Sequence, residues 1–128
     1  MNYLLDTHTF LWFLTDDPQL SRKGKSVIDD PETNKYVSIA SFWEIAIKLS
    51  KGKLELTQPF STLMAQMELN GFELLSISFE HTLELSTLPH HHGDPFDRII
   101  ISQAITEKYI AISRDKNFDK YTGLQLLW

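Results

Sequence analysis

The fold class is decided by residues 95–112, which read PFDRIIISQAITEKYIAI. Proline followed by an acid favours the first turn of a helix, so we expect a helix over residues 95–108. This helix is strongly apolar, and residues 109–112 form an apolar run of strand length directly after it. A helix that leads into a buried strand is the repeating unit of a parallel α/β sheet.

The same alternation continues along the rest of the chain. We expect strands at residues 3–5, 36–39 and 72–77 and a short last strand at 124–127. Helices are expected at residues 7–15, 20–30, 42–49, 59–69 and 78–89, with breaks at Pro18, Pro31 and Gly52. Residues 1–128 therefore predict one α/β domain with a mostly parallel central sheet flanked by helices.

The composition excludes several classes of site. The chain has no cysteine, which rules out disulfides, thiolate nucleophiles and cysteine-based zinc sites. The apolar stretch at residues 10–14 is too short for a signal sequence or a membrane span. We therefore expect a cytoplasmic protein without membrane contact, in which any metal ion is bound through oxygen or nitrogen.

The net charge of −5 argues against a broad basic surface for nucleic acid. This argument weakens if several acids share one pocket, because bound divalent cations would reverse the local field felt by a phosphate. The positions of the acids therefore matter more than their number.

Four acids follow the four main predicted strands. Asp6 ends the first strand, Glu44 lies just after the second, Asp97 follows the loop after the third, and Asp115 lies just past the fourth. The carboxyl ends of parallel strands form the ligand crevice of open α/β sheets. Carboxylates gathered there suit a hard cation such as Mg²⁺ or Mn²⁺.

Each of these acids also has a purely structural interpretation. Ser41 and Glu44 have the spacing of a capping box, and Asp94 is well placed as the N-cap before Pro95. Asp6 can cap the following helix, and Asp115 can be an ordinary turn residue. These roles explain single acids, but not why every strand exit carries one.

Four motifs resemble those of PIN-domain proteins, and most closely those of the VapC-type toxins of bacterial toxin-antitoxin pairs. They span nearly the whole chain in the family's order, and the third is the most specific: LDT at 5–7, SIASFWEIAIK at 38–48, HGDPFDR at 92–98 and ISRD at 112–115.

This resemblance implies a flavodoxin-like three-layer α/β/α sandwich and an endoribonuclease that uses Mg²⁺ or Mn²⁺. It also implies a homodimer and inhibition by a small cognate antitoxin. Asp6, Glu44, Asp97 and Asp115 match the family's metal-binding catalytic acids. We assign the third acid to Asp97 rather than Asp94, because the family's acid directly precedes the apolar helix.

Several neighbours are expected to support these acids. Thr7 and Ser113 could orient a carboxylate, and Asp94 could cap the helix or support the site. Arg98 could clamp phosphate or, as we expect, pair with an acid. A further group of lysines after Glu44 could guide an RNA backbone, although a solvated helix face is the commoner role of such residues: Lys48, Lys51 and Lys53.

The remaining conspicuous residues are assigned less specific roles. We expect His90, His91 and His92 to form a solvent-facing loop rather than a metal site, since consecutive residues cannot easily face one ion. Half of the aliphatic and aromatic side chains at residues 10–14, with Trp43 and Ile47, are expected in the core, and some of the others at a dimer or antitoxin contact.

Two other functions are open. A haloacid-dehalogenase-like phosphatase also begins with a strand-end Asp, but it needs a second Asp two residues later, where this chain has His8. A PIN-like module that binds RNA or protein without catalysis is the second alternative, and substitution of Asp6 or Asp97 by Asn would distinguish it from an enzyme.

Overall fold

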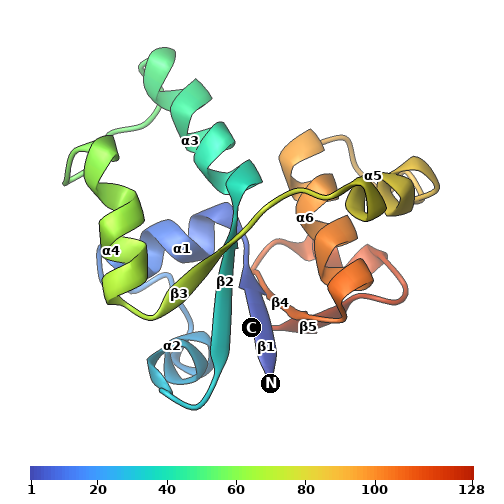
Figure 1. Cartoon of the computed structure of the whole chain (residues 1–128), viewed down its shortest axis with the longest axis horizontal. Helices are drawn as coiled ribbons and strands as arrows, with labels where there is room; N and C mark the ends of the chain where they lie inside the picture. The colour runs from blue at the N-terminus through green and yellow to red at the C-terminus, as the bar shows by residue number, and fades with distance from the viewer.

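A computed structural model describes residues 1–128 as a five-stranded sheet with helices on both faces (Figure 1). The strand order is β3-β2-β1-β4-β5, and every neighbouring pair is parallel. The strands are β1 Asn2–Leu5, β2 Asn34–Ser38, β3 Phe72–Leu75, β4 Ile110–Ile112 and β5 Gln125–Leu127. The helices are α1 Thr7–Leu14, α2 Arg22–Asp29, α3 Ile39–Ser50, α4 Leu63–Leu69, α5 Phe79–Ser86 and α6 Pro95–Glu107, with short 3₁₀ turns η1 Phe60–Thr62 and η2 Lys116–Lys120.

Two hydrophobic clusters cover the two faces of this sheet, because successive side chains of a strand point to opposite sides. Tyr3 and Leu5 of β1 face the cluster that contains residues of α1, α2, α3 and α4. Leu4 lies between them in sequence and faces the cluster built mainly on α6. The predicted three-layer sandwich with a central parallel sheet is therefore confirmed, and the sheet is wholly parallel.

The helix that decided the fold is buried over most of its circumference. All residues of α6 from Arg98 to Ala104 are buried. The helix lies against α5 and α3 as well as β4, so it has no continuous polar face.

The chain reverses its direction across the sheet between β1 and β4. From β1 it proceeds outward to β2 and β3, and it then crosses to β4 on the other side of β1. Such a switch point opens a crevice at the carboxyl ends of the two strands. Leu5 pairs in register with Ile112, so the next residues, Asp6 and Ser113, lie side by side at this crevice.

Some local expectations were wrong. β2 leads directly into α3, with Ser38 as the N-cap, so Ser41 and Glu44 lie inside the helix and form no capping box. The turn η2 was not predicted. None of the helices is both long and apolar enough to cross a membrane.

Candidate functional site

Asp6 is held at the end of β1 by three hydrogen bonds. Its backbone N–H donates to the carbonyl of Ile112, and its Oδ1 accepts from the N–H of Thr9 at 2.8 Å, which makes it the N-cap of α1. Its Oδ2 accepts from the Ser113 hydroxyl at 2.5 Å. The side chain is nearly fully buried, and this burial raises the pKa of the carboxyl above its ordinary value.

Asp97 lies in the first turn of α6, where Asp94 caps the helix. The Asp94 Oδ1 accepts a hydrogen bond from the Asp97 N–H at 2.9 Å, and Pro95 occupies the first helical position. Asp94 therefore has the capping role that its sequence position predicts. Asp6, Glu44 and Asp115 are near enough to act on the Asp97 carboxylate electrostatically.

Burial and neighbouring negative charge both raise the pKa of Asp97. Burial raises it first, and repulsion by Asp94, Asp6, Asp115 and Glu44 raises it further, to about 8. Three of these carboxylates, Asp6, Glu44 and Asp115, come from other segments of the chain, so negative charge from several segments acts on Asp97.

His92 contacts Asp97 and is not the solvent-facing residue that the sequence predicted. Its side chain is only 10% exposed, and its Nε2 lies 3.2 Å from the Asp97 Oδ2. Its Nδ1 lies 2.7 Å from the Tyr121 hydroxyl. His90 and His91 are exposed, as expected.

Arg98 does not pair with an acid, contrary to our expectation. It is buried, and its guanidinium donates to the carbonyls of Pro89 and Leu88 at 2.8 and 3.2 Å. It also donates to the Tyr121 hydroxyl at 3.1 Å. Its connection to Asp97 therefore runs through Tyr121 and His92, and its donors face the chain rather than the crevice.

Glu44 is buried on α3 with one oxygen left unpaired. Its Oε2 pairs with Lys48 Nζ at 2.8 Å, whereas Oε1 has no hydrogen-bond partner. An unsatisfied buried carboxylate oxygen is costly and therefore calls for a ligand or a role. Thr7 lies nearby but donates to the Ser41 hydroxyl at 2.9 Å, so it joins α1 to α3 rather than orienting an acid.

Asp115 follows β4 at the other side of the crevice. Its Oδ1 caps η2 by accepting from the Asn117 N–H at 2.9 Å, and its own N–H donates to the Ser113 hydroxyl at 3.1 Å. Asp115 and Asp6 line a cavity of about 220 Å³ together with His8, Trp12 and Arg114. Ser113 thus contacts both acids and has the orienting position expected of it.

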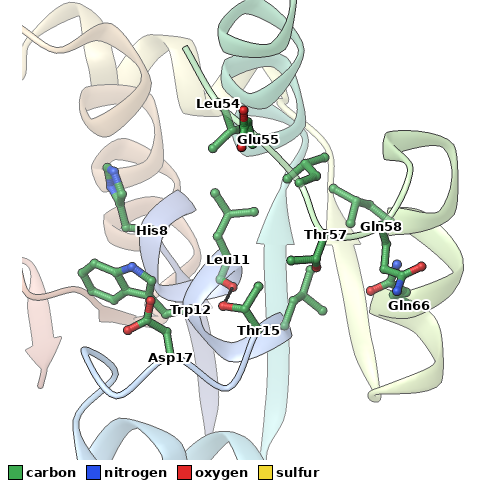
Figure 2. A pocket seen from close by; sticks show the side chains of 13 residues that line it. His8, Leu11, Trp12, Thr15, Asp17, Leu54, Glu55, Thr57, Gln58 and Gln66 are labelled. Carbon is green, nitrogen blue, oxygen red and sulfur yellow. Dashed lines mark hydrogen bonds between the residues drawn. The ribbon is translucent and has the colours of Figure 1, made fainter. Parts of the chain in front are cut away.

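A basic cleft and an apolar groove adjoin the acids. The cleft has Lys48, Lys51 and Lys53 on one side and the start of α6 on the other. The groove runs between α1 and the segment that precedes η1, and Figure 2 shows Leu11 inside it, below Leu54 and Glu55. His8 and Trp12 border both this groove and the acidic cavity.

The donor set of this crevice fits a hard divalent cation. It consists of carboxylates, one of which has a buried unpaired oxygen, and their mutual repulsion is the kind that a cation relieves. In the present side-chain positions, no three acidic or histidine side chains lie close enough to hold one ion together. The metal-binding role of Asp6, Glu44, Asp97 and Asp115 therefore stays a prediction.

Sequence reasoning did not predict that His92, Tyr121, Trp12 and Arg114 lie at or beside the acidic site. His92 stands two residues before Asp94 in the third motif, a position that could have marked it. Tyr121 and Trp12 carried no signal beyond being aromatic, because their contacts are formed between distant segments.

Several solved structures share this architecture. The chain aligns with the toxin-antitoxin complex VapBC2 from Rickettsia felis, solved on a DNA fragment from its promoter, with a TM-score of 0.72, 16% identity and coverage of 99% of this chain and 98% of that one. VapBC-1 of nontypeable Haemophilus influenzae aligns with a TM-score of 0.68 and 20% identity, over 99% of this chain and 97% of its own. The PIN domain endonuclease Utp24 aligns at 0.56 and 18% identity over 98% of this chain and 83% of its own.

These identities are low enough that the structures show a shared fold and nothing finer. No curated protein sequence matches the chain significantly. The model of the PIN domain family, however, matches residues 3–124, which is almost the entire sequence. The chain therefore belongs to the PIN domain family.

Proposed function

We propose that this chain is a metal-dependent endoribonuclease and the toxin of a toxin-antitoxin pair. The proposal is supported by Asp6 and Asp115, which share a cavity at the carboxyl ends of β1 and β4, and by the buried unpaired oxygen of Glu44 and the charge that Asp97 meets from these acids. These acids come from four separate segments, and the charges of Asp6, Glu44 and Asp115 act unfavourably on Asp97, which a bound cation would relieve.

Asp6, Asp97 and Glu44 would hold one Mg²⁺ or Mn²⁺ ion, with Asp115 completing the site or holding a second ion. The cation would supply positive charge to activate water and to stabilise the negative charge that develops on the phosphate. Ser113 keeps the Asp6 carboxylate in place, and His92 does the same for Asp97. Because water is the attacking group, the products are expected to carry 5′-phosphate and 3′-hydroxyl ends.

A small antitoxin and a second copy of the chain complete the proposal. The apolar groove beside the acids is lined by Leu11, Trp12, Leu14 and Leu54, which remain only partly buried. Trp43 on α3 is 59% exposed and Phe79 on α5 is 72% exposed. Such aliphatic and aromatic surface supports protein partners, and an RNA target supports a cytoplasmic location.

The first test is cleavage of a mixed RNA pool by the purified chain in Mg²⁺ or Mn²⁺, compared with EDTA. We expect cleavage that depends on metal and is absent from the Asp6→Asn/Asp97→Asn double variant. The matched control is Asp29→Asn/Glu68→Gln, which makes the same charge change at exposed residues of α2 and α4. It should cleave like the wild type.

The ends of the products separate the mechanisms. Products that end in 2′,3′-cyclic phosphate would refute attack by water, because they arise from the ribose hydroxyl. A folded wild-type protein that binds Mn²⁺ but cleaves no more than the double variant would favour the binding module instead.

The toxin role has its own test. Expression of the wild-type chain in a bacterial host should arrest growth, and expression of the double variant at the same level should not. Equal arrest by both proteins would show that toxicity does not come from this acidic site.

A further inference from the structure

The acidic cavity has one wall that the proposed catalysis does not use. Trp12 of α1 and Arg114, which follows β4, lie beside Asp6 and Asp115 in this cavity. The Arg114 guanidinium carbon lies 4.7 Å from the centroid of the Trp12 ring, which is the geometry of a cation–π contact. His8 adds a second ring, tilted at 42° with its centroid 5.8 Å from that of Trp12.

Arg114 is free to bind a ligand. Ser113 and Asp115, its neighbours in sequence, belong to the acidic site, yet Arg114 forms no ion pair within 4.0 Å with any carboxylate. Its side chain is exposed and lies against an aromatic ring rather than an acid. The donors of its planar guanidinium group are therefore available to a phosphate oxygen, and its outer face is available for stacking.

Trp12 is a firm support for this arginine. The ring packs partly against the hydrophobic cluster beneath α1, and Trp128 lies against it with ring centroids 6.0 Å apart. Arg114, stacked on the packed Trp12 indole, forms a flat, positively charged platform with it. Protein sites that hold unpaired nucleotides use platforms of this kind, because every base has a π-face and every nucleotide carries a phosphate.

We propose that His8, Trp12 and Arg114 form a subsite for the nucleotide next to the scissile phosphate. Arg114 binds a backbone phosphate through its donors, and the base stacks on the platform that it forms with Trp12. The inference rests on the proposed ribonuclease activity and specifies its substrate. A base can reach the platform only when it is unstacked from its neighbours, so the substrate is an unpaired segment of RNA rather than a duplex.

The direct test uses a single-stranded RNA 12-mer of mixed sequence, with Ca²⁺ in place of Mg²⁺, and measures binding by fluorescence anisotropy. Arg114→Gln should weaken binding about tenfold. The affinity of Arg114→Lys, which keeps the charge but not the planar group, should lie between those of the wild type and Arg114→Gln. The matched control Arg22→Gln removes an exposed arginine from α2 and should change the affinity less than twofold. A duplex of the same length should bind more weakly than the single strand.

Nuclear magnetic resonance locates the contact without any need for catalysis. The chain has three tryptophans, so its indole N–H groups give three signals, and Trp12→Phe assigns one of them. Addition of the 12-mer should shift the Trp12 signal and leave that of Trp43 in place. Trp12→Phe keeps a ring at this position, so the signal is assigned without removal of the packing beneath it.

Cleavage supplies a third readout once a cleaved oligonucleotide is known. An abasic site beside the cleaved bond should lower kcat/KM in the wild type by about tenfold, and by much less in Trp12→Leu, because the two changes remove the same stacking contact.

The outcomes separate this inference from the proposed function. If Arg114→Gln binds RNA like the wild type and the Trp12 signal does not move, the subsite is wrong even when the chain cleaves RNA. If Arg114→Gln binds RNA normally but no longer binds the antitoxin, the platform belongs to a protein partner instead. If RNA binding depends on Arg114 and Trp12 but no metal-dependent cleavage occurs, the subsite stands and the ribonuclease proposal fails.

Discussion

His92 Nε2 lies 3.2 Å from Asp97 Oδ2, and the other nitrogen of the same ring lies 2.7 Å from the Tyr121 hydroxyl. The Tyr121 oxygen accepts a hydrogen bond from Arg98, so its own proton is available to the His92 Nδ1. We therefore assign the ring proton to Nε2, where it is donated to Asp97. Burial lowers the pKa of His92, which favours this neutral form.

Tyr121→Phe tests this chain of contacts. Loss of the hydroxyl leaves the His92 Nδ1 without its donor and releases the preference for the Nε2–H tautomer. We expect a change in the ¹⁵N shifts of His92 and a 10- to 100-fold loss of Mn²⁺ affinity, which is typical when a residue that orients a metal ligand is removed. Tyr3→Phe is the control, because the Tyr3 hydroxyl contacts only the Met1 sulfur at 3.9 Å. Unchanged shifts and affinity in Tyr121→Phe would show that the hydroxyl has no such role.

The raised pKa of Asp97 predicts how the metal-free chain responds to pH. In the unfolded chain this carboxyl ionises near 3.8, whereas in the folded chain it keeps its proton up to about 8. The resulting stability is fully present below pH 3.8 and is lost as the pH rises to about 8. Asp6, whose pKa is also raised, acts in the same direction.

Asp97→Asn should therefore stabilise the metal-free chain near pH 8 by about 1–3 kcal/mol, and by less near pH 5. Thermal unfolding in EDTA between pH 5 and pH 9 measures the difference. Parallel stability curves for the two proteins would contradict a raised pKa at this position.

Metal binding should reverse this dependence. A cation binds the ionised carboxylates, so its binding releases protons and becomes tighter as the pH rises. At 100 times its dissociation constant, Mn²⁺ should stabilise the wild type by about 2.7 kcal/mol. At a fixed Mn²⁺ concentration, the rise in Tm should be larger at pH 8 than at pH 6 and absent in Asp6→Asn/Asp97→Asn. An equal rise in the double variant would place the bound metal elsewhere.

The fold was largely predictable because its signals are local. The alternation of apolar runs with helical segments gave the five strands, and the apolar sequence of α6 matches its burial on most sides. The start of α3 was mispredicted because Ser38 and Ser41 are both plausible N-caps, and only the register of β2 against its neighbours decides between them.

The candidate site was predictable only in part. The acids could be placed because strand ends share one edge of a parallel sheet, so their proximity follows from topology. The partners of those acids could not, because His92 meets Tyr121 across 29 residues and Ser113 meets Asp6 across 107. Such pairs depend on how loops pack, and no periodicity in the sequence encodes them.

The ion pair between Glu44 and Lys48 gives the last prediction. The Glu44 carboxylate is buried, whereas the Lys48 side chain is 37% exposed, so Lys48→Ala leaves a buried charge without its only partner. We expect a loss of about 1–2 kcal/mol in the free energy of unfolding of the metal-free chain, reduced from a fully buried pair because solvent screens the lysine. Lys51→Ala, which removes an exposed lysine at the end of the same helix, should cost much less.

Mn²⁺ distinguishes a purely structural Glu44 from one that binds metal. If Glu44 binds the cation, Mn²⁺ replaces the missing ammonium group, and the Tm of Lys48→Ala should rise more on addition of Mn²⁺ than that of the wild type. If the two proteins gain equally, Glu44 does not bind the cation. The comparison is sharp because the substitution leaves all four candidate ligands unchanged.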